Sequence, residues 1–263
     1  DGTVQAPSAG GPAVAARLGA AFARFHRDVA DIDPERLHVT IPDFHNPGRR
    51  SEELVELVLT DPHGRVAGSQ EVGAVGHELT VHRRLIEVAN GWREPAVPTR
   101  VAHLDATPTN VLVDDASGDV VAVLDLDTVM PSSWLWDVGD LLRSACCRPP
   151  ELKPEPSRAI FSVMVGQGPP VPLPEFDPEA ADALLDAYRA GVGDLLTPDE
   201  LAALPISGAV VAYEQSVRFL SDYLEGDRYY AVSHPGENLD RARQQVSLID
   251  PMQAYAERKA RGA

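Results

Sequence analysis

The sequence has few lysines and a deficit of positive charge, and this composition limits the kinds of partner that the protein can bind. Only Lys153 and Lys259 are lysines, against 21 arginines, and acidic residues outnumber basic ones by 40 to 23, which gives a net charge of −17. So acidic a chain argues against nucleic acid as a partner, because phosphate backbones need a cationic surface. It leaves a phosphate-bearing ligand open, since a site can be locally cationic or can recruit a metal ion.

The scarcity of cysteine and of long apolar runs predicts a protein of a reducing compartment, outside the membrane. Cys146 and Cys147 are the only cysteines, and neighbours in sequence rarely form a disulfide, so two free thiols and a reducing compartment are expected. The chain opens on no signal peptide, and it has no run of about 18 apolar residues that could cross a bilayer. We therefore expect a cytoplasmic protein with no membrane partner.

Most of the hydrophobic pattern predicts helices. Residues 1–12 are small residues and turn-formers, and a tail or linker is expected there. Beyond them, apolar residues recur at three- and four-residue spacings, with a proline-rich break over 149–174. Three helices are expected over 13–30, about 71–90 and 206–224. Two more are expected to begin at Ser51, after an irregular loop, and at about Asp137. Helix N-caps are expected at Asp177, Thr197 and Asn238.

One segment predicts a β hairpin instead. "NVLV" and "VVAVLDL" are short apolar strands, and "DDASGD" between them is a turn. The hairpin returns the chain to its start, so Asp125 at its far end should come close to Asp105 and Asn110, which precede the first strand. The expected fold class is therefore α+β, mostly α, with a small hairpin that carries a polar cluster.

This polar cluster has the composition that phosphoryl transfer requires. One carboxylate must orient and deprotonate the attacking hydroxyl, while a second carboxylate and an amide hold the metal that neutralises the phosphates. Asp105 would be the base, and Asn110 and Asp125 would be ligands of a hard cation such as Mg²⁺. The plainer alternative is that these are turn and cap residues at strand ends. The full order H-x-D-x₄-N, strand, turn, strand, Asp favours the catalytic interpretation.

The same stretch resembles a known family. "HLDATPTN…VLDLD" is similar to the catalytic and metal-binding loops of the aminoglycoside phosphotransferase and choline kinase group, relatives of the protein kinases. "DLDTVMPSSWLWDVGDLLR", "LHVTIPDFHNP", "VRFLSDYLEGDRYY" and "HPGENLDRARQQ" look more specifically like the N-acetylhexosamine 1-kinases. The similarity runs from about residue 15 to the C-terminus. It implies a protein-kinase-like C-terminal lobe that uses ATP and Mg²⁺ to phosphorylate the anomeric hydroxyl of an N-acetylhexosamine.

The resemblance assigns roles to the residues of the cluster. Asp105 matches the catalytic base, and His103 matches the histidine that braces the catalytic loop. Asn110 and Asp125 match the metal ligands, and Asp127 matches a second acidic position after the metal aspartate.

Four residues outside the cluster also match family positions. Asp137 matches an acidic residue that fixes the catalytic loop by hydrogen bonds, and a helix N-cap is a compatible plainer role. Arg218 and Tyr229 match positions that contact the sugar, although Arg218 could equally pair with an acidic neighbour and Tyr229 could be a packed aromatic. His45 could reach a ligand, or it could be a loop histidine satisfied by the protein.

The sequence has no counterpart of the second kinase lobe. Kinases of this type have an N-terminal lobe with a glycine-rich loop, a strand lysine and a helix glutamate. No G-x-G-x-x-G occurs here, Lys153 lies in a proline-rich loop, and Lys259 lies near the C-terminus. We therefore expect residues 13–263 to be the C-terminal lobe alone, with 1–12 as a hinge remnant. The face left open by the other lobe favours a homodimer.

Two alternative functions stay open. A kinase lobe without its partner lobe could be a catalytically impaired module that binds a sugar, a metal or a protein. A metal-dependent hydrolase could use the same carboxylates, but it would need a further ligand such as a clustered histidine, and only His103 is near in the sequence.

Overall fold

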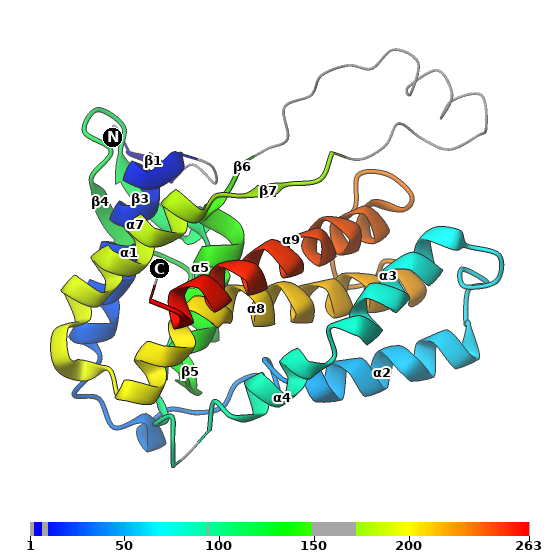
Figure 1. The fold of residues 1–263 in the computed structure, drawn as a ribbon, viewed down its shortest axis with the longest axis horizontal. Helices are drawn as coiled ribbons and strands as arrows, with labels where there is room; N and C mark the ends of the chain where they lie inside the picture. The colour runs from blue at the N-terminus through cyan, green and yellow to red at the C-terminus, as the bar shows by residue number, and fades with distance from the viewer. Residues whose placement is uncertain (1–2, 7–9, 94, 149–171, 263) are drawn as a thin grey trace.

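The structure, a computed structural model, describes residues 3–6, 10–93, 95–148 and 172–262. Helices make up most of the described chain, and short strands connect them (Figure 1). The helices are α1 (Gly11–Asp28), α2 (Pro47–Thr60), α3 (Gln70–Val81), α4 (Arg84–Asn90), α5 (Trp134–Ala145), α7 (Pro178–Val192), α8 (Pro198–Leu224) and α9 (Glu237–Ala260). The strands are β1 (Thr3–Gln5), β2 (Arg100–Ala102), β3 (Val111–Asp114), β4 (Val120–Val123), β5 (Met130–Ser132), β6 (Cys147–Arg148) and β7 (Glu175–Phe176), and short 3-10 helices cover Pro34–Arg36, Pro108–Asn110, Leu126–Thr128 and Gly193–Leu195.

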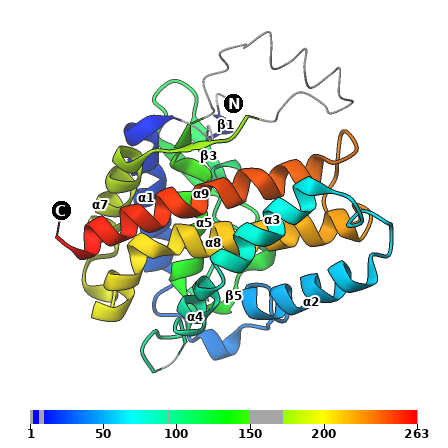
Figure 2. The same ribbon diagram turned by 45° about the vertical axis from the view of Figure 1, so that its right-hand side comes forward.

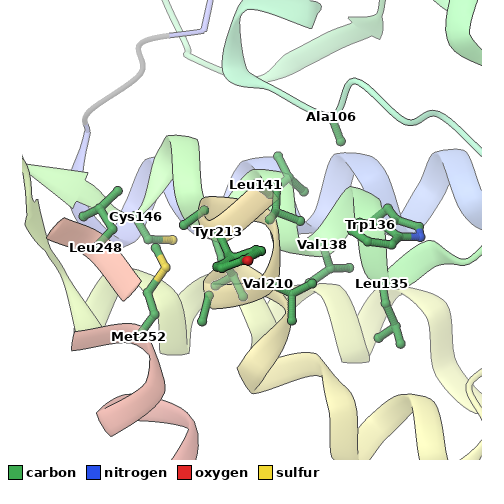
Figure 3. Close-up of a cluster of buried hydrophobic side chains, with 14 of the residues drawn as sticks. Ala106, Leu135, Trp136, Val138, Leu141, Cys146, Val210, Tyr213, Leu248 and Met252 are labelled. Atoms are coloured by element: carbon green, nitrogen blue, oxygen red, sulfur yellow. The ribbon is translucent and has the colours of Figure 1, made fainter. Parts of the chain in front are cut away.

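Two helix pairs form the helical body. The helices α8 and α9 lie side by side across the middle of the molecule, and α1 and α7 lie side by side at one end (Figures 1 and 2). Helix α5 packs on α8, and its buried face joins the core. Figure 3 shows part of this core, with Val138 and Leu141 from α5, Val210 from α8 and Met252 from α9.

Helices α5 and α8 approach closely because small residues meet at their contact. A Cβ atom added to Gly139 would lie 2.6 Å from the carbonyl oxygen of Ser207, which is backbone and cannot move aside. A Cβ atom added to Gly208 would lie 2.9 Å from Cβ of Leu142. This close contact fixes the relative position of two helices that both carry buried carboxylates of the site.

The strands of the described residues form three small antiparallel sheets, and the predicted hairpin is one of their parts. In the sheet β1–β3–β4, Val113 lies opposite Val4 on one side and Val120 on the other, with an irregularity in the register after Leu112. Strand β2 pairs with β5, and β6 pairs with β7. The β1–β3–β4 sheet lies beside α1 (Figure 1).

Several boundaries differ from the sequence prediction in the first half of the chain. Residues 3–5 form β1 rather than a tail, because Val4 pairs with Val113 of a distant strand. Helix α2 begins four residues before Ser51, where the side chain of Asn46 caps it by accepting a hydrogen bond from the Arg49 backbone. The predicted helix over 71–90 is two helices, α3 and α4, separated at residues 82–83.

Two predicted caps are wrong, and two are confirmed. Helix α5 begins at Trp134 with Ser133 as its cap, so Asp137 lies in the first turn instead. Gly236 precedes α9, and Asn238 donates its amide hydrogens to carboxylates rather than capping the helix. Asp177 caps α7, and Thr197 forms a capping box that starts α8.

Some predictions about the rest of the chain can be compared only in part. Helix α8 runs unbroken from Pro198 through Pro205 to Leu224, and is therefore longer than the predicted segment 206–224. Most of the proline-rich break over 149–174, including Lys153, lies outside the described residues. Within the described residues, no helix combines the length and the apolar character needed to span a membrane.

Candidate active site

The H-x-D-x₄-N motif lies on the loop that joins β2 to β3. The Asn110 side chain donates from Nδ2 to Oδ2 of Asp105 at 2.7 Å and to the Asp105 carbonyl oxygen at 2.8 Å. Asp105 is partly exposed, and Asn110 is buried. The amide therefore orients the carboxylate while part of that carboxylate remains open to solvent.

The end of the hairpin returns to this loop, as the sequence predicts. The Leu124 backbone N–H donates to the carbonyl oxygen of Asn110 at 2.8 Å, and Nε2 of His103 lies 2.9 Å from the Leu124 carbonyl oxygen. Asp125 follows with φ of +59°, a left-handed conformation that turns the chain away from the strand. Asp125 and Asp127 are both exposed, and neither carboxylate has a polar partner among the residues the structure describes.

The oxygen atoms of this group suit a hard divalent cation. Both hydrogen bonds of the Asn110 side chain use its Nδ2, which leaves Oδ1 as an acceptor, and the carboxylate of Asp125 has no partner in the described ranges. No three His, Cys, Asp or Glu side chains converge as a metal site anywhere in the described part of the chain. An amide and one or two carboxylates, completed by phosphate oxygens and water, match the manner in which proteins bind Mg²⁺ with a nucleotide.

A buried carboxylate anchors the start of the loop. Asp137, with a fully buried side chain, accepts hydrogen bonds from the backbone N–H of His103 at 2.7 Å and of Leu104 at 2.6 Å. Nε2 of His26 lies 2.8 Å from the same carboxylate. Burial acts to raise the pKa of Asp137, but hydrogen bonds from His26 and from the backbone N–H of His103 act against it, and this pKa is lowered.

The other ring nitrogen of His26 faces a hydroxyl group. Its Nδ1 lies 2.8 Å from the hydroxyl oxygen of Tyr188, and the ring stacks on Trp134 at 4.5 Å between centroids. Burial lowers the pKa of His26 by more than Asp137 raises it. A neutral ring satisfies both contacts, because Nε2–H can donate to Asp137 while Nδ1 accepts from the hydroxyl.

A second buried histidine holds the same loop from the opposite side. Nδ1 of His45 lies 2.7 Å from Oε2 of Glu214, and Nε2 lies 3.1 Å from the carbonyl oxygen of Leu104. The ring stacks on Trp136 at 4.7 Å. Since both nitrogens are engaged by the protein, the contacts of His45 fit the satisfied loop histidine rather than a ligand contact.

Leu104 is therefore held at both ends, and its backbone is unusual. This residue has φ of +67°, a conformation that costs a leucine on the order of 1–3 kcal/mol. Asp137 accepts from its N–H group, and His45 contacts its carbonyl oxygen. The next residue is Asp105, so the direction in which the Asp105 side chain leaves the backbone depends on these two contacts.

A cavity of about 690 Å³ opens beside Phe44, the residue before His45. Its walls come from α2, the second half of α8, the loop before α2 and the turn that follows α8. The lining residues are Ile41, Phe44, Arg50, Glu53, Glu56, Leu57, Thr60, Pro62, His63, Arg218, Ser221, Asp222, Glu225, Arg228, Tyr229 and Tyr230.

Arg218 and Tyr229 both line this cavity. The guanidinium of Arg218 lies 5.1 Å from the ring centroid of Phe44 and 5.8 Å from those of Tyr229 and Tyr230. Such cation–π contacts leave the N–H groups of an arginine available to a ligand. Arg218 makes no ion pair within the described ranges, so it does not form the salt bridge that the sequence left open. Tyr229 is 68% exposed, and it is therefore not a packed core aromatic.

The sequence reasoning missed several residues of this region. Arg50 and Tyr230 both line the cavity, and Nε of Arg50 and the hydroxyl of Tyr230 are buried without a hydrogen-bond partner among the described residues. Burial raises the pKa of Tyr230 to about 12, so its hydroxyl is protonated and able to donate. His26 and Glu214 were also missed, although Glu214 stands in the apolar run "GAVVAYEQSV", where a buried charge requires a partner.

A loop of this kind before a short hairpin, with helices behind it, is typical of kinase-type phosphotransferases. The sequence model of the phosphotransferase enzyme family (APH) matches residues 1–204, more than three quarters of the 263 residues. The chain belongs to this family.

Two solved structures resemble the chain. An aminoglycoside phosphotransferase from Alicyclobacillus acidocaldarius subsp. acidocaldarius DSM 446 is 18% identical, with a TM-score of 0.62, and the match covers 98% of this chain and 68% of that one. An aminoglycoside-3'-phosphotransferase of type VIII is 17% identical, with a TM-score of 0.42, over 81% of this chain and 66% of that one. The first likeness shows a kinase-like α+β fold, in agreement with the fold class expected from the sequence.

Proposed function

We propose that the protein transfers the γ-phosphate of ATP to a hydroxyl group of a small molecule, and that this group is the anomeric hydroxyl of an N-acetylhexosamine. The observation that carries the transfer reaction is the contact of Asn110 with Asp105 on a loop that also meets the hairpin end at Leu124, the residue before Asp125. Membership of the phosphotransferase family supports the reaction class. The sugar-kinase strings around Arg218 and Tyr229 support the acceptor.

Asp105 acts in this proposal as the general base. Its carboxylate takes the proton of the attacking hydroxyl, the hydroxyl oxygen forms the new bond to phosphorus, and the bond from phosphorus to the bridging oxygen of ADP breaks. Asn110 fixes the orientation of the carboxylate, and His103 and Asp137 are positioning residues that hold the loop. Such preorganisation lowers the barrier because the reacting groups need no further alignment.

The residues that would hold Mg²⁺ are Asn110 and Asp125, with Asp127 as an accessory acid. The ion, when bound, would neutralise charge on the phosphates of the nucleotide. The exposed carboxylates and the free Oδ1 of the amide support this role. On this proposal, residues 13–263 form the lobe that binds the acceptor and the metal.

The cavity lined by Phe44 and Arg218 is the acceptor site in this proposal. Nε of Arg50, the guanidinium of Arg218 and the hydroxyl of Tyr230 have no acceptor among the described residues, and the hydroxyl and acetamido oxygens of an N-acetylhexosamine could accept from them. The exposed ring of Tyr229 offers an apolar surface to one face of the sugar.

An acceptor panel tests the proposed function. The full chain is incubated with ATP, Mg²⁺ and, separately, N-acetylglucosamine, N-acetylgalactosamine, glucose, choline and an aminoglycoside, and products are identified by ³¹P NMR. We expect a sugar 1-phosphate from the two N-acetylhexosamines. Turnover of choline or the aminoglycoside alone would reject the sugar assignment. Calorimetric binding of the sugar without any turnover would favour a catalytically impaired binding module.

A further inference from the structure

The contacts of His45 determine how many protons its ring carries. Nδ1 faces a carboxylate oxygen of Glu214, and Nε2 faces the carbonyl oxygen of Leu104, at 2.7 Å and 3.1 Å. Neither partner group has a hydrogen to give, because a carbonyl only accepts and an ionised carboxylate only accepts. With Glu214 ionised, both contacts are hydrogen bonds only if both ring nitrogens carry hydrogens, so the geometry points to an imidazolium ion.

The surroundings of His45 support a positive charge. Glu214 is fully buried, and its other oxygen accepts from the Asn46 backbone N–H at 2.8 Å, so its carboxylate is held against the ring. Arg218 on α8 opposes the charge, and Asp140 on α5, which is paired with Arg143, favours it. Burial acts to lower the pKa of His45, but the charge and hydrogen bond of Glu214 outweigh it, and the pKa is raised.

The same pair connects the catalytic loop to the wall of the cavity. Glu214 and Arg218 lie one turn apart on α8, and Arg218 lines the cavity. Phe44 also lines the cavity, and its ring lies 4.9 Å from that of His45. A change in the position of His45 would therefore be felt both by the cavity wall and by the carbonyl oxygen that precedes Asp105.

We propose that His45, as an imidazolium ion paired with Glu214, is a positioning residue that ties the catalytic loop to the wall of the acceptor cavity and keeps Asp105 aligned. The part about Asp105 rests on the proposed function. The charge of His45 and its link to the loop do not, and they can be measured without turnover.

The first test is a pH titration of the full chain by NMR. Signals of His45 and His26 are assigned by loss in the His45→Gln and His26→Gln variants. We expect protons on both ring nitrogens of His45 at neutral pH and on one nitrogen of His26. The backbone amides of Leu104 and Asp105 should shift with the midpoint of His45, and this titration should vanish in His45→Gln. A neutral His45 ring, or loop amides that ignore its titration, would overturn the proposal.

The second test separates positioning from a merely structural role. In the N-acetylhexosamine assay, His45→Gln and Glu214→Gln should lower kcat by roughly 10- to 100-fold, the effect of a misplaced reacting group, with KM for the sugar within about threefold. The wild-type rate should fall on the alkaline side, and His45→Gln should lose that decline. His77→Gln, at an exposed position on α3, should match wild type.

Either of two kinetic results would contradict the proposal: an unchanged kcat in His45→Gln, or an alkaline decline that persists in it. Folding is checked by the melting curve of each variant, and Glu214→Gln provides a second route to the same loss. A wild-type chain with no transfer activity would count against the proposed function, and the NMR titration would then decide the link between His45 and the loop.

Discussion

Two buried histidine–carboxylate pairs hold the backbone of Leu104, one at its N–H group and the other at its carbonyl oxygen. They differ in which member of the pair makes the contact. His26 and His45 each contact a buried acid, and each ring stacks on a tryptophan from the first turn of α5. In the pair with Asp137 the carboxylate touches the loop, whereas in the pair with Glu214 the imidazole does.

The difference between the pairs lies in the second partner of each ring. His26 meets the hydroxyl of Tyr188, which can donate, and its pKa is lowered. His45 meets a carbonyl oxygen, which can only accept, and its pKa is raised. A carboxylate neighbour therefore does not by itself make a buried histidine a cation, because the group on the other nitrogen decides how many hydrogens the ring needs.

The largest expected effect is at Asp137. The Asp137→Asn substitution replaces one accepting carboxylate oxygen with a donating amide group and removes the negative charge. Three buried donors face this side chain, so at least one of them loses its partner. We expect the free energy of unfolding to fall by roughly 3–5 kcal/mol, because hydrogen bonds to a charged acceptor, worth about 1.5–3 kcal/mol each, are weakened and one buried N–H group is left without an acceptor. Urea denaturation measures this change, and Asp115→Asn, at an exposed position of the hairpin turn, is the matched control. A loss under about 1 kcal/mol would mean that the loop does not depend on this carboxylate.

Glu214→Gln should have a smaller effect on stability. Because His45 can lose its proton when the anion is removed, no charge stays buried, and the cost is that of weakened hydrogen bonds to His45 and Asn46, about 1–3 kcal/mol. The same denaturation assay measures it, with Glu52→Gln at an exposed position as control. A loss as large as that of Asp137→Asn would remove the distinction between the two pairs.

The two histidines should affect stability at opposite ends of the pH range. The raised pKa of His45 means that its contribution is complete below the ordinary histidine value, about 6.5, and is lost as the pH rises through the folded value. The lowered pKa of His26 means that stability is lost as the pH falls from about 6.5 toward the folded value.

Denaturation curves from about pH 5 to about pH 9 measure these contributions against His45→Gln and His26→Gln. The difference in stability between wild type and His45→Gln should shrink at alkaline pH, and the difference for His26→Gln should shrink at acid pH. Parallel pH profiles for the two variants would show that both rings titrate alike.

The smallest effects should come from two tyrosine hydroxyls. Tyr188→Phe removes the hydroxyl that contacts His26 and should cost about 0.5–1.5 kcal/mol of stability. Tyr230→Phe removes a buried hydroxyl that has no partner among the described residues, and it should leave stability unchanged or slightly higher. In the sugar assay Tyr230→Phe should instead raise KM by roughly 2- to 10-fold, the value of one hydrogen bond. An unaltered KM would place the sugar away from Tyr230.

Local signals in the sequence predict much of this fold, and contacts between distant segments account for what they miss. The hairpin and the caps at Asp177 and Thr197 depend on neighbouring residues, and they were predicted. Strands β1 and β5 have three residues each and exist because they pair with β3 and β2, so no local pattern announces them.

The site divides in the same way. The motif from His103 to Asn110 is local, and its internal contact was predictable. The partners of His45 are 59 and 169 residues away, and His26 is 111 residues from Asp137, so one sequence cannot reveal those pairs. Only a charged residue in an apolar run, such as Glu214, signals that a partner exists, without saying which one.

In the proposed function, both histidine–carboxylate pairs hold the loop so that Asp105 can act as the base of phosphoryl transfer. The most direct test is the initial rate of N-acetylhexosamine phosphorylation by Asp105→Asn, with folding checked by its melting curve and with Asp115→Asn as control. We expect the rate of Asp105→Asn to be lower than that of wild type by roughly 10²- to 10⁴-fold, the usual contribution of a general base. The rate of Asp115→Asn should be close to that of wild type. A rate for Asp105→Asn within about threefold of wild type would contradict the proposal.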